Sequence, residues 1–495
     1  MKTFIRLASL ILAMLMLVST FASCGQPNDD KGQEETSDTV ATTVGQTEDV
    51  NKSKLPEMNW EGKEYRVLGR DGSRYPVFEN FEVDRDELPE DVVGVAVWNR
   101  NNTLMSKYGI DVVGTLVEPP IDLAKVFINA GDDMYDLVLL PNNMMQQFGT
   151  AGQLVNLKGL EHVDLEHDCW NDYANEQLTF GGKLYYTTNK FLLEDKHRTW
   201  IVWYNRTLAS ELNIGYLEQE VFDGTWTIDR MIEIAKLGSA ETDGSDGMTS
   251  GDRWGVILSA KAIFGVLAYS CGFRLSEMQS DGYPALVGAT DQMMSIIDKV
   301  LTLTADTETC FVEKLRPTDD ENNANSAEIY RTGRAVMMVH CVSWFSNLPR
   351  LTFEYGVLPT PKYDAEQEDY YCSPNPPNGV LLAVPSTISD IKFAGFGLQA
   401  ISEESVETSY KEYVETKCKL QIAFDEDMAK CLNIVFDNIV YDIAYLDDYG
   451  ELKTKVVDML ITESSNMYSR LFAKFEKRAK NEMKTTKEAY AALSY

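Results

Sequence analysis

Histidine, paired cysteines and positive charge are scarce in this chain of 495 residues. Four histidines occur, and the eight cysteines include no CxxC pair, so neither a structural zinc site nor a metal-capture role is indicated. Lys and Arg number 45 against 77 Asp and Glu, which gives a formal net charge of −32. So acidic a surface repels phosphate backbones and anionic lipid headgroups, which argues against nucleic-acid binding.

Familiar catalytic motifs are also missing. The chain has no nucleophile elbow, phosphate-binding loop or HExxH motif. Acidic pairs such as Glu403/Glu404 and Asp132/Asp133 are adjacent in sequence, whereas glycoside hydrolysis needs two carboxyl groups facing each other across roughly 5–10 Å. The acidic loop 239–253 lacks the Asp-x-Asn-x-Asp-Gly spacing of a calcium loop. We expect no enzymatic activity, no cofactor and no metal.

An apolar run follows the first basic residues of the chain. Residues 1–23 begin with Lys2 and Arg6, continue with apolar residues and end in small ones, as a secretory signal peptide does. The run is short for a membrane span. The ending FASC resembles a bacterial lipobox, in which the cysteine, here Cys24, is lipidated and becomes the mature N-terminus. The alternative is an ordinary signal peptide followed by an incidental cysteine.

The next segment, residues 24–57, is interpreted as a lipid-anchored flexible linker. Its polar, acidic and Thr-rich sequence shows no apolar periodicity, so it cannot bury enough surface to offset the entropy of ordering. The diacyl form that lipobox processing implies is a stable anchor. We therefore expect the protein at the cell membrane, on its extracytoplasmic face toward the extracellular side.

The remaining chain is long enough for two lobes. Its first part alternates strands and helices, which predicts a parallel α/β sheet, with any ligand outside the carboxyl ends of the strands. The predicted elements are a strand at 64–68, a helix at 92–108, a strand at 110–117, a helix at 121–130 and a strand at 135–140.

Further strands and a helical C-terminus follow. Thr227 is predicted to cap a helix, with Trp226 beside it as a packing residue. The strand at 335–339 leads to Trp344, which could fill a core or stack on a ligand. The other predicted elements are strands at 199–204 and 379–385 and helices at 389–401, 403–417, 425–445, 452–461 and 464–491.

The order of several motifs resembles one protein family. YDLVLLPNNMMQQFGTAGQLVNL, GGKLYYTTNKF, WIVWYNRTLASELNI, GTWTIDRMIEIAK and YRTGRAVMMV follow one another in the chain. They are similar to motifs of the extracellular solute-binding lipoproteins of ABC importers, in the branch that mostly carries sugars and oligosaccharides. The resemblance extends over most of the mature chain.

This resemblance implies a two-lobe, periplasmic-binding-protein-like α/β fold of type II, with a ligand cleft between the lobes and a helical C-terminus. It also implies a monomer that captures a sugar or oligosaccharide and delivers it to an ABC permease in the membrane. The implied divisions are lobe 1 at 58–195 plus 379–425, lobe 2 at 196–378 plus 426–495, and hinges near Asp195–Arg198 and Asn375–Gly379.

Six residues are carried over to the implied ligand cleft. Their amide, carboxylate and guanidinium groups suit the paired hydroxyls of a sugar, and an aromatic face suits its C–H side. Each has a plainer alternative: a turn with a local ion pair, helix capping, a hinge pair with Glu194 or Asp195, or core packing. The predicted ligand-binding residues are Arg70, Asp71, Asn142, Asn143, Arg198 and Trp344.

Two other functions stay open from the sequence. One is a secreted, lipid-anchored enzyme acting on glycosides, and the other is a binding protein for a non-sugar solute such as a peptide. Under the leading hypothesis, Trp344→Ala should weaken ligand binding at least tenfold, or about 1.4 kcal/mol, with little change in the melting temperature of the free protein.

Overall fold

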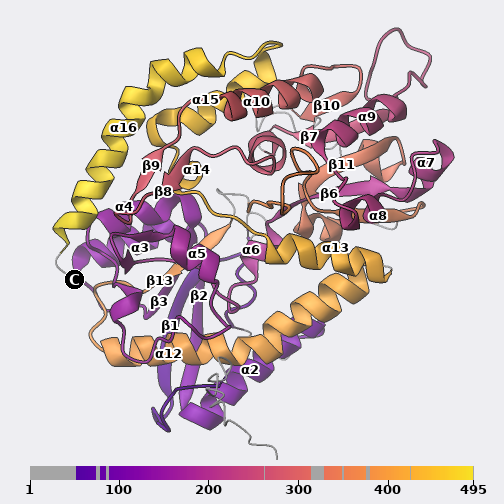
Figure 1. The fold of residues 1–495 in the computed structure, drawn as a ribbon. Helices are drawn as coiled ribbons and strands as arrows, with labels where there is room; N and C mark the ends of the chain where they lie inside the picture. Colours follow the sequence, from indigo (N-terminus) through magenta and orange to yellow (C-terminus); the bar gives the residue numbers. More distant parts are fainter. Residues whose placement is uncertain are drawn as a thin grey trace, which may run out of the picture. The chain divides into compact units, whose positions relative to one another are not determined.

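Two larger β-sheets, of four and five strands, organise the described part of the chain (Figure 1). The computed structural model describes residues 52–73, 79–84, 89–260, 262–313, 328–347, 351–374, 379–423 and 425–493. The strands are β1 (Lys63–Arg70), β2 (Ile110–Val117), β3 (Leu137–Pro141), β4 (Thr179–Phe180), β5 (Lys183–Leu184), β6 (Trp200–Asn205), β7 (Trp254–Ser259), β8 (Ser276–Met278), β9 (Pro284–Leu286), β10 (Cys310–Glu313), β11 (Ala335–Cys341), β12 (Tyr355–Leu358) and β13 (Val380–Ala383).

Helices connect and cover these strands. The α-helices are α2 (Val92–Tyr108), α3 (Pro120–Ala130), α4 (Met145–Thr150), α5 (Asp172–Gln177), α6 (Glu194–His197), α7 (Arg206–Glu211), α8 (Leu217–Phe222), α9 (Ile228–Gly238), α10 (Asp291–Thr304), α12 (Ile391–Ser405), α13 (Glu426–Asp437), α14 (Ile443–Asp447), α15 (Leu452–Thr462) and α16 (Tyr468–Ala492). Shorter 3-10 helices are η2 (Asn142–Met144), η3 (Leu157–Gly159), η5 (Val342–Asn347) and η8 (Tyr449–Glu451), and π-helical segments are η4 (Phe264–Tyr269), η6 (Val406–Tyr410) and η7 (Glu412–Ile422).

The first sheet has the strand order β13-β3-β1-β2. β1 pairs in parallel with β2 and with β3, as the alternation of strands and helices predicts, and β13 joins antiparallel to β3. All five residues of β3 are buried, because the strand lies inside the sheet and is covered on both faces. The parallel arrangement predicted for 64–140 is confirmed.

The second sheet has the order β10-β7-β11-β6-β12 and mixes directions. β7 pairs in parallel with β10 and β11, whereas β6 is antiparallel to both β11 and β12. Side chains of β6 alternate between two hydrophobic clusters: Val202 belongs to one, and Ile201 and Trp203 belong to the other. The period of two in a strand thus divides the core between the two faces of this sheet.

Local signals define several helix ends. α2 begins after Asp91, whose carboxylate accepts a hydrogen bond from the Gly94 backbone N–H at 3.0 Å. It ends at Gly109, which has φ of 62°, and a Cβ there would lie 2.2 Å from the Asn59 amide oxygen. Thr227 caps α9 as predicted, accepting from the Arg230 backbone N–H at 3.3 Å.

The single helix predicted over 425–445 is wrong in its second half. α13 ends at Asp437, and the Val440 backbone N–H then donates to the Cys372 carbonyl at 2.8 Å. Asp442 starts a new helix, α14, by accepting from the Ala444 backbone N–H at 2.8 Å. Backbone pairing with a distant segment therefore interrupts an otherwise helical pattern.

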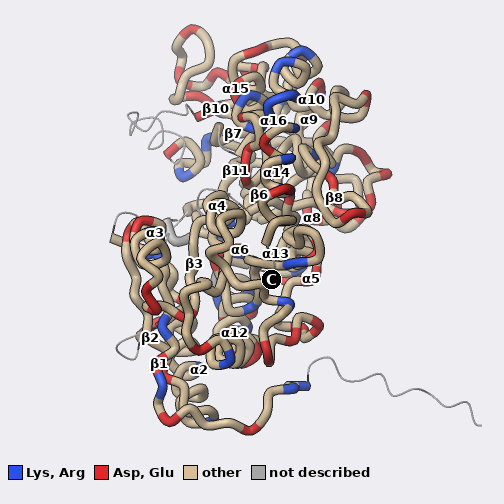
Figure 2. Tube along the Cα trace, turned by 90° about the vertical axis from the view of Figure 1, so that its left-hand side faces the viewer, with Lys and Arg blue, Asp and Glu red and all other residues tan. Residues whose placement is uncertain are grey.

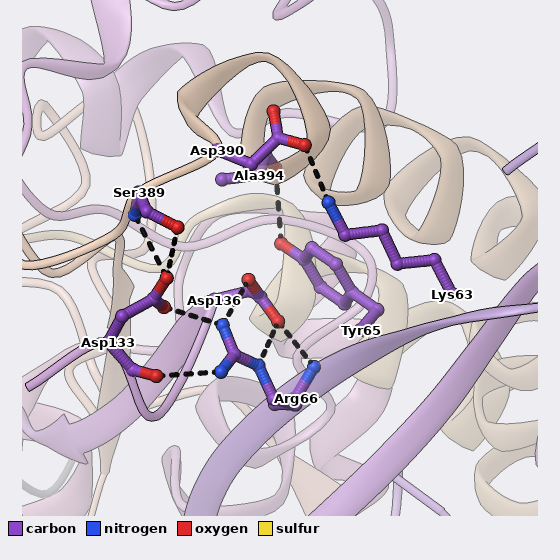
Figure 3. Close-up of polar contacts among 8 residues, drawn as sticks. All are labelled: Lys63, Tyr65, Arg66, Asp133, Asp136, Ser389, Asp390 and Ala394. Atoms are coloured by element: carbon purple, nitrogen blue, oxygen red, sulfur yellow. Dashed lines mark hydrogen bonds and ion pairs between the residues drawn. The ribbon is translucent and has the colours of Figure 1, made fainter.

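A polar cluster fixes the start of α12 against the first sheet (Figure 3). Arg66 of β1 donates from Nε to Asp136 at 2.9 Å and from Nη2 to Asp133 at 2.7 Å. Asp133 also accepts from the Ser389 backbone N–H at 3.2 Å, next to Asp390, which caps α12. These contacts use Asp133 structurally, since its carboxylate and that of Asp136 share the guanidinium group of Arg66.

The last helix, α16, contacts segments far away in sequence. It packs along η8 and α15. Near its end, the Tyr490 ring stacks on Phe180 and on Tyr185, with ring centroids 4.5 and 5.4 Å apart. Residues assigned to lobe 2 from the sequence therefore touch a segment assigned to lobe 1.

The charge of the chain is spread over its surface. Figure 2 shows Asp and Glu distributed along the whole described trace, with Lys and Arg between them. Within the described ranges, no helix combines the length and the apolar composition that crossing a bilayer requires.

Candidate functional site

Arg70 and Asp71 lie at the carboxyl end of β1. The Arg70 side chain is nearly buried, its Nε lies 2.9 Å from a Glu118 carboxylate oxygen, and its backbone N–H donates to the Asn80 side chain at 2.8 Å. Asp71 forms a turn, in which its carboxylate accepts from the Ser73 backbone N–H at 2.9 Å and the Ser73 hydroxyl at 2.6 Å. The turn expected as an alternative is thus present, whereas the ion pair of Arg70 is made with the distant Glu118 rather than locally. A ligand role for both residues stays a prediction.

Asn142 and Asn143 follow β3 at the same edge of the sheet, because β1 and β3 are parallel neighbours. The Asn142 backbone N–H donates to the Gly379 carbonyl at 3.0 Å. Neither amide caps the helix that follows, since η2 and α4 begin without a side-chain capping bond. The Oδ1 atoms of both residues are buried and accept no hydrogen bond from the described residues. Two such acceptors are costly to bury unless a partner supplies donors.

Five consecutive charged or titratable residues, 194–198, are buried at and after the short helix α6. Arg198 donates from Nε to Glu194 at 3.1 Å and from Nη1 to the Ser343 hydroxyl at 3.0 Å. The hinge pair between Arg198 and Glu194 foreseen as an alternative is therefore present. Since Ser343 follows β11, Arg198 joins the α6 segment to the second sheet.

Glu194 links the two arginines of the predicted site. Burial raises the pKa of its carboxyl group, and the positive charges of Arg198 and Arg70 partly offset this rise. Arg70 and Arg198 are thus brought within electrostatic range of one carboxylate, although they are far apart in sequence. Among the described residues, the Oδ1 atoms of Asn142 and Asn143 accept no hydrogen bond from Arg70 or Arg198.

Glu82 is a buried member of the same group that the sequence did not reveal. It is fully buried, and the Asn80 side chain donates to it at 3.4 Å. Burial and the neighbouring Glu194 carboxyl raise the pKa of Glu82 to about 8. Its carbonyl accepts from Nη2 of the buried Arg100 at 2.7 Å, which fixes the segment on α2. No periodic pattern surrounds Glu82, so only its contacts identify it.

We expect Glu82 to make stability depend on pH. Its folded-state pKa of about 8 lies above its ordinary value of 4.5, so the folded state retains a proton that the unfolded state loses. The stabilisation is full below pH 4.5 and is lost as the pH rises toward 8. Denaturant unfolding across this range should show that Glu82→Gln makes this decline smaller, since Glu194, Glu218 and Asp447 also have raised pKa values and keep their share of it.

The control for this pH profile is Glu64→Gln, on the exposed side of β1. This variant should keep the wild-type decline in the free energy of unfolding. Identical pH profiles for Glu82→Gln and the wild type would contradict the assignment.

Trp344 lies in the same hydrophobic cluster as Ile201 and Trp203, with 6% of its surface exposed. Its ring centroid is 5.6 Å from that of Tyr330, 5.8 Å from that of Trp203 and 5.9 Å from that of His340. It directly follows Ser343, which binds Arg198. The indole therefore fills a core next to the buried residues 194–198, and stacking on a ligand stays a prediction.

Some predictions fall outside the described residues. These are the signal peptide, the lipidation of Cys24, the linker up to residue 51 and most of the second hinge, 375–378. Trp226 is confirmed as a packing residue: it is fully buried and donates to the Pro359 carbonyl at 2.9 Å.

Comparison with known proteins shows the fold. No family model matches the sequence, and no curated protein matches it. Among solved structures, a cyclo/maltodextrin-binding protein complexed with maltotetraose has 15% sequence identity and a TM-score of 0.58, over 86% of this chain and 99% of that one. An ABC substrate-binding protein from Listeria monocytogenes in complex with cycloalternan has 13% identity and a TM-score of 0.53, over 85% and 99% of the two chains.

The chain therefore has the two-lobe α/β fold of periplasmic substrate-binding proteins, which confirms the fold predicted from the sequence. Both of these similar structures are binding proteins with an oligosaccharide bound.

Proposed function

We propose that this protein captures a sugar or oligosaccharide and delivers it to an ABC permease. The observation that carries the proposal is the pair of buried, unsatisfied amide oxygens of Asn142 and Asn143 at the carboxyl edge of the first sheet. Hydroxyl groups of a sugar are donors that satisfy such acceptors. The two oligosaccharide complexes with the same fold support this ligand class.

The proposal includes the ligand-binding role of six residues: Arg70, Asp71, Asn142, Asn143, Arg198 and Trp344. Arg70 and Arg198 present planar guanidinium groups held by Glu118 and Glu194, which limits the entropy lost when a ligand binds. Asp71 is half-buried in its turn and can accept a further hydroxyl at its second oxygen. Trp344 would contribute an edge or face of its ring next to Arg198.

The proposal also includes the division into lobes and the place of the protein in the cell. Lobe 1 would comprise 58–195 plus 379–425, and the pairing of β13 with β3 supports the second of these ranges. Lobe 2 would comprise 196–378 plus 426–495. A lipid on Cys24 would hold a monomer at the extracytoplasmic face of the membrane, beside the permease.

Binding without catalysis is the form of this function that the contacts favour. Of the acidic pairs in the sequence, Glu404 binds Lys107 at 2.8 Å and Asp133 binds Arg66 at 2.7 Å, so both carboxylates have structural partners. A hydrolase needs an acid and a base that reach the glycosidic bond. Turnover of a chromogenic glycoside that a single carboxylate variant abolishes would instead establish an enzyme.

Isothermal titration of the purified full-length protein against a panel of glycans tests the proposal, with peptides titrated in parallel. We expect at least one glycan to bind, and Asn142→Ala to weaken that binding about tenfold, because a hydrogen bond to a buried acceptor is lost (about 1.4 kcal/mol). Asn102→Ala, on the exposed face of α2, is the matched control and should bind as the wild type does. Binding of peptides alone would overturn the sugar assignment.

A further inference from the structure

Basic residues gather on the last helix of an otherwise acidic chain. α16 carries seven Lys or Arg residues against three Glu, which leaves a net charge of +4, whereas the whole chain has −32. All seven basic residues are exposed. Figure 1 shows α16, in yellow, along the outside of the described part of the chain. The helix is therefore a local exception to the acidic character of the protein.

Four of these cations lie on one line of the helix. Arg470, Lys474, Lys477 and Lys484 follow one another at intervals of four, three and seven residues, so they share one face. The line covers fourteen residues, or about 21 Å along the helix axis. The opposite face packs on η8, α15 and β9. Its buried residues are Tyr468, Phe472, Ala479, Met483, Thr486 and Tyr490.

Three of the four cations form no ion pair with any described residue. These three are Arg470, Lys474 and Lys477. The other basic residues of α16 each form an ion pair with an acidic side chain. Lys484 is the most exposed of these, at 72%, and its Nζ lies 3.6 Å from a Glu488 carboxylate oxygen. The outward line thus holds positive charge that the protein itself does not neutralise.

The chemistry of this line fits a flat anionic surface better than a protein partner. Among the described residues, α16 contributes none of the large apolar side chains that are exposed. Protein–protein interfaces have an apolar core and are depleted in lysine, so a stable protein partner would find no anchor here. A convex line of ammonium and guanidinium groups instead matches a layer of phosphate charges such as lipid headgroups supply.

The net negative charge of the chain does not prevent such a contact. At physiological ionic strength, electrostatic interactions fall off over about 8 Å, so a surface that touches α16 interacts mainly with the cations of that helix. Each Lys or Arg held near an anionic bilayer raises affinity about fivefold. The repulsion of lipid headgroups expected from the overall composition therefore applies to the other faces of the protein.

We propose that the face formed by Arg470, Lys474, Lys477 and Lys484, named here the α16 basic face, docks on a membrane surface rich in anionic phospholipids. The contact is electrostatic and reversible, because all four side chains are charged. The inference goes beyond the proposed function, since it assigns the side of the protein that meets the membrane and does not depend on the identity of the ligand.

The test measures how fast exposed lysines are acetylated when the purified full-length protein is mixed with vesicles. One kind of vesicle contains phosphatidylcholine alone, and the other contains about 30% phosphatidylglycerol, which supplies a negative surface potential. Lys474, Lys477 and Lys484 should react about fivefold more slowly with the anionic vesicles, because the headgroup layer covers their amines. A lipid on Cys24 would attach the protein to both kinds of vesicle, so the comparison isolates the α16 basic face.

The variant that disrupts the α16 basic face is Arg470→Glu with Lys474→Glu. The remaining lysines of the face should then be acetylated at the same rate with both kinds of vesicle, because two cations are replaced by anions. The matched control, Lys411→Glu with Lys430→Glu, makes the same change in net charge at two other exposed lysines. It should keep the wild-type shielding. Melting curves identify any variant that fails to fold.

Three results would overturn the assignment. Equal acetylation of the α16 basic face with both kinds of vesicle would show that it meets no membrane. Loss of shielding in the control variant would show that overall charge, rather than this face, governs the contact. Shielding by soluble polyphosphate but not by anionic vesicles would assign the face to a soluble polyanion. Under the proposal, about 1 M salt abolishes the wild-type shielding, because screening then acts within about 3 Å.

Discussion

Arg198→Ala is expected to lower the free energy of unfolding by about 3–5 kcal/mol, because it leaves the buried Glu194 carboxylate without its closest partner. Both side chains are almost fully buried, at 3% and 1% exposure, so water cannot replace the lost charge. Arg70 is near enough to offset part of the cost. Urea unfolding at neutral pH gives the free energy directly.

The matched control is Arg331→Ala, which breaks an exposed ion pair with Glu328. Such surface pairs contribute about 0–1 kcal/mol, so this variant should unfold close to the wild type. A double variant, Arg198→Met with Glu194→Met, should recover much of the stability, since it removes both buried charges. Equal losses for Arg198→Ala and Arg331→Ala would show that the α6 ion pair is solvated.

Trp344→Ala is expected to lower the free energy of unfolding by about 3–5 kcal/mol, because it opens a cavity among Trp203, Tyr330 and His340. The sequence alone predicts little effect on the melting temperature, and the 6% exposure of the indole replaces that expectation. Weaker ligand binding, by at least tenfold, stays part of the prediction. Thermal unfolding and calorimetry measure the two effects separately.

Trp98→Ala provides the comparison for this variant, since Trp98 lies on α2 with 37% of its surface exposed. It should unfold within about 0.5 kcal/mol of the wild type, as surface substitutions do. An unchanged melting temperature for Trp344→Ala, with lost affinity, would instead show that the indole faces the ligand. Lost stability with full affinity in the folded fraction would assign it to the core alone.

The sequence predicts the first sheet well because its signals are local. The helix over 92–108 has a capping Asp91 before it and Gly109 after it, and its bounds agree with α2 to the residue. The strand at 110–117 likewise agrees with β2. Helix-capping signals of this kind depend on residues close together in the sequence, so they can be recognised from the sequence alone.

Contacts between distant segments could not be predicted in this way. The break after Asp437 arises from pairing with Cys372, and nothing near Asp437 in sequence indicates it. The ion pair of Glu194 and Arg198 has helical spacing and was foreseen, whereas the approach of Glu82 to Glu194 depends on how two segments meet. Contacts between residues near in sequence, such as the Glu194–Arg198 pair, can therefore be predicted from the sequence. Contacts between separate elements, such as that of Glu82 with Glu194, cannot.

The return of β13 to the first sheet has a consequence for biosynthesis. β13 pairs with one edge of β3, and it is made only after all five strands of the second sheet. Until then, the edge of β3 presents unpaired backbone groups to any other strand it meets. The nascent chain thus carries an open sheet edge while the residues between Pro141 and Val380 are made, about half of its length, and a protein ending before Val380 would retain that edge as a template for aggregation.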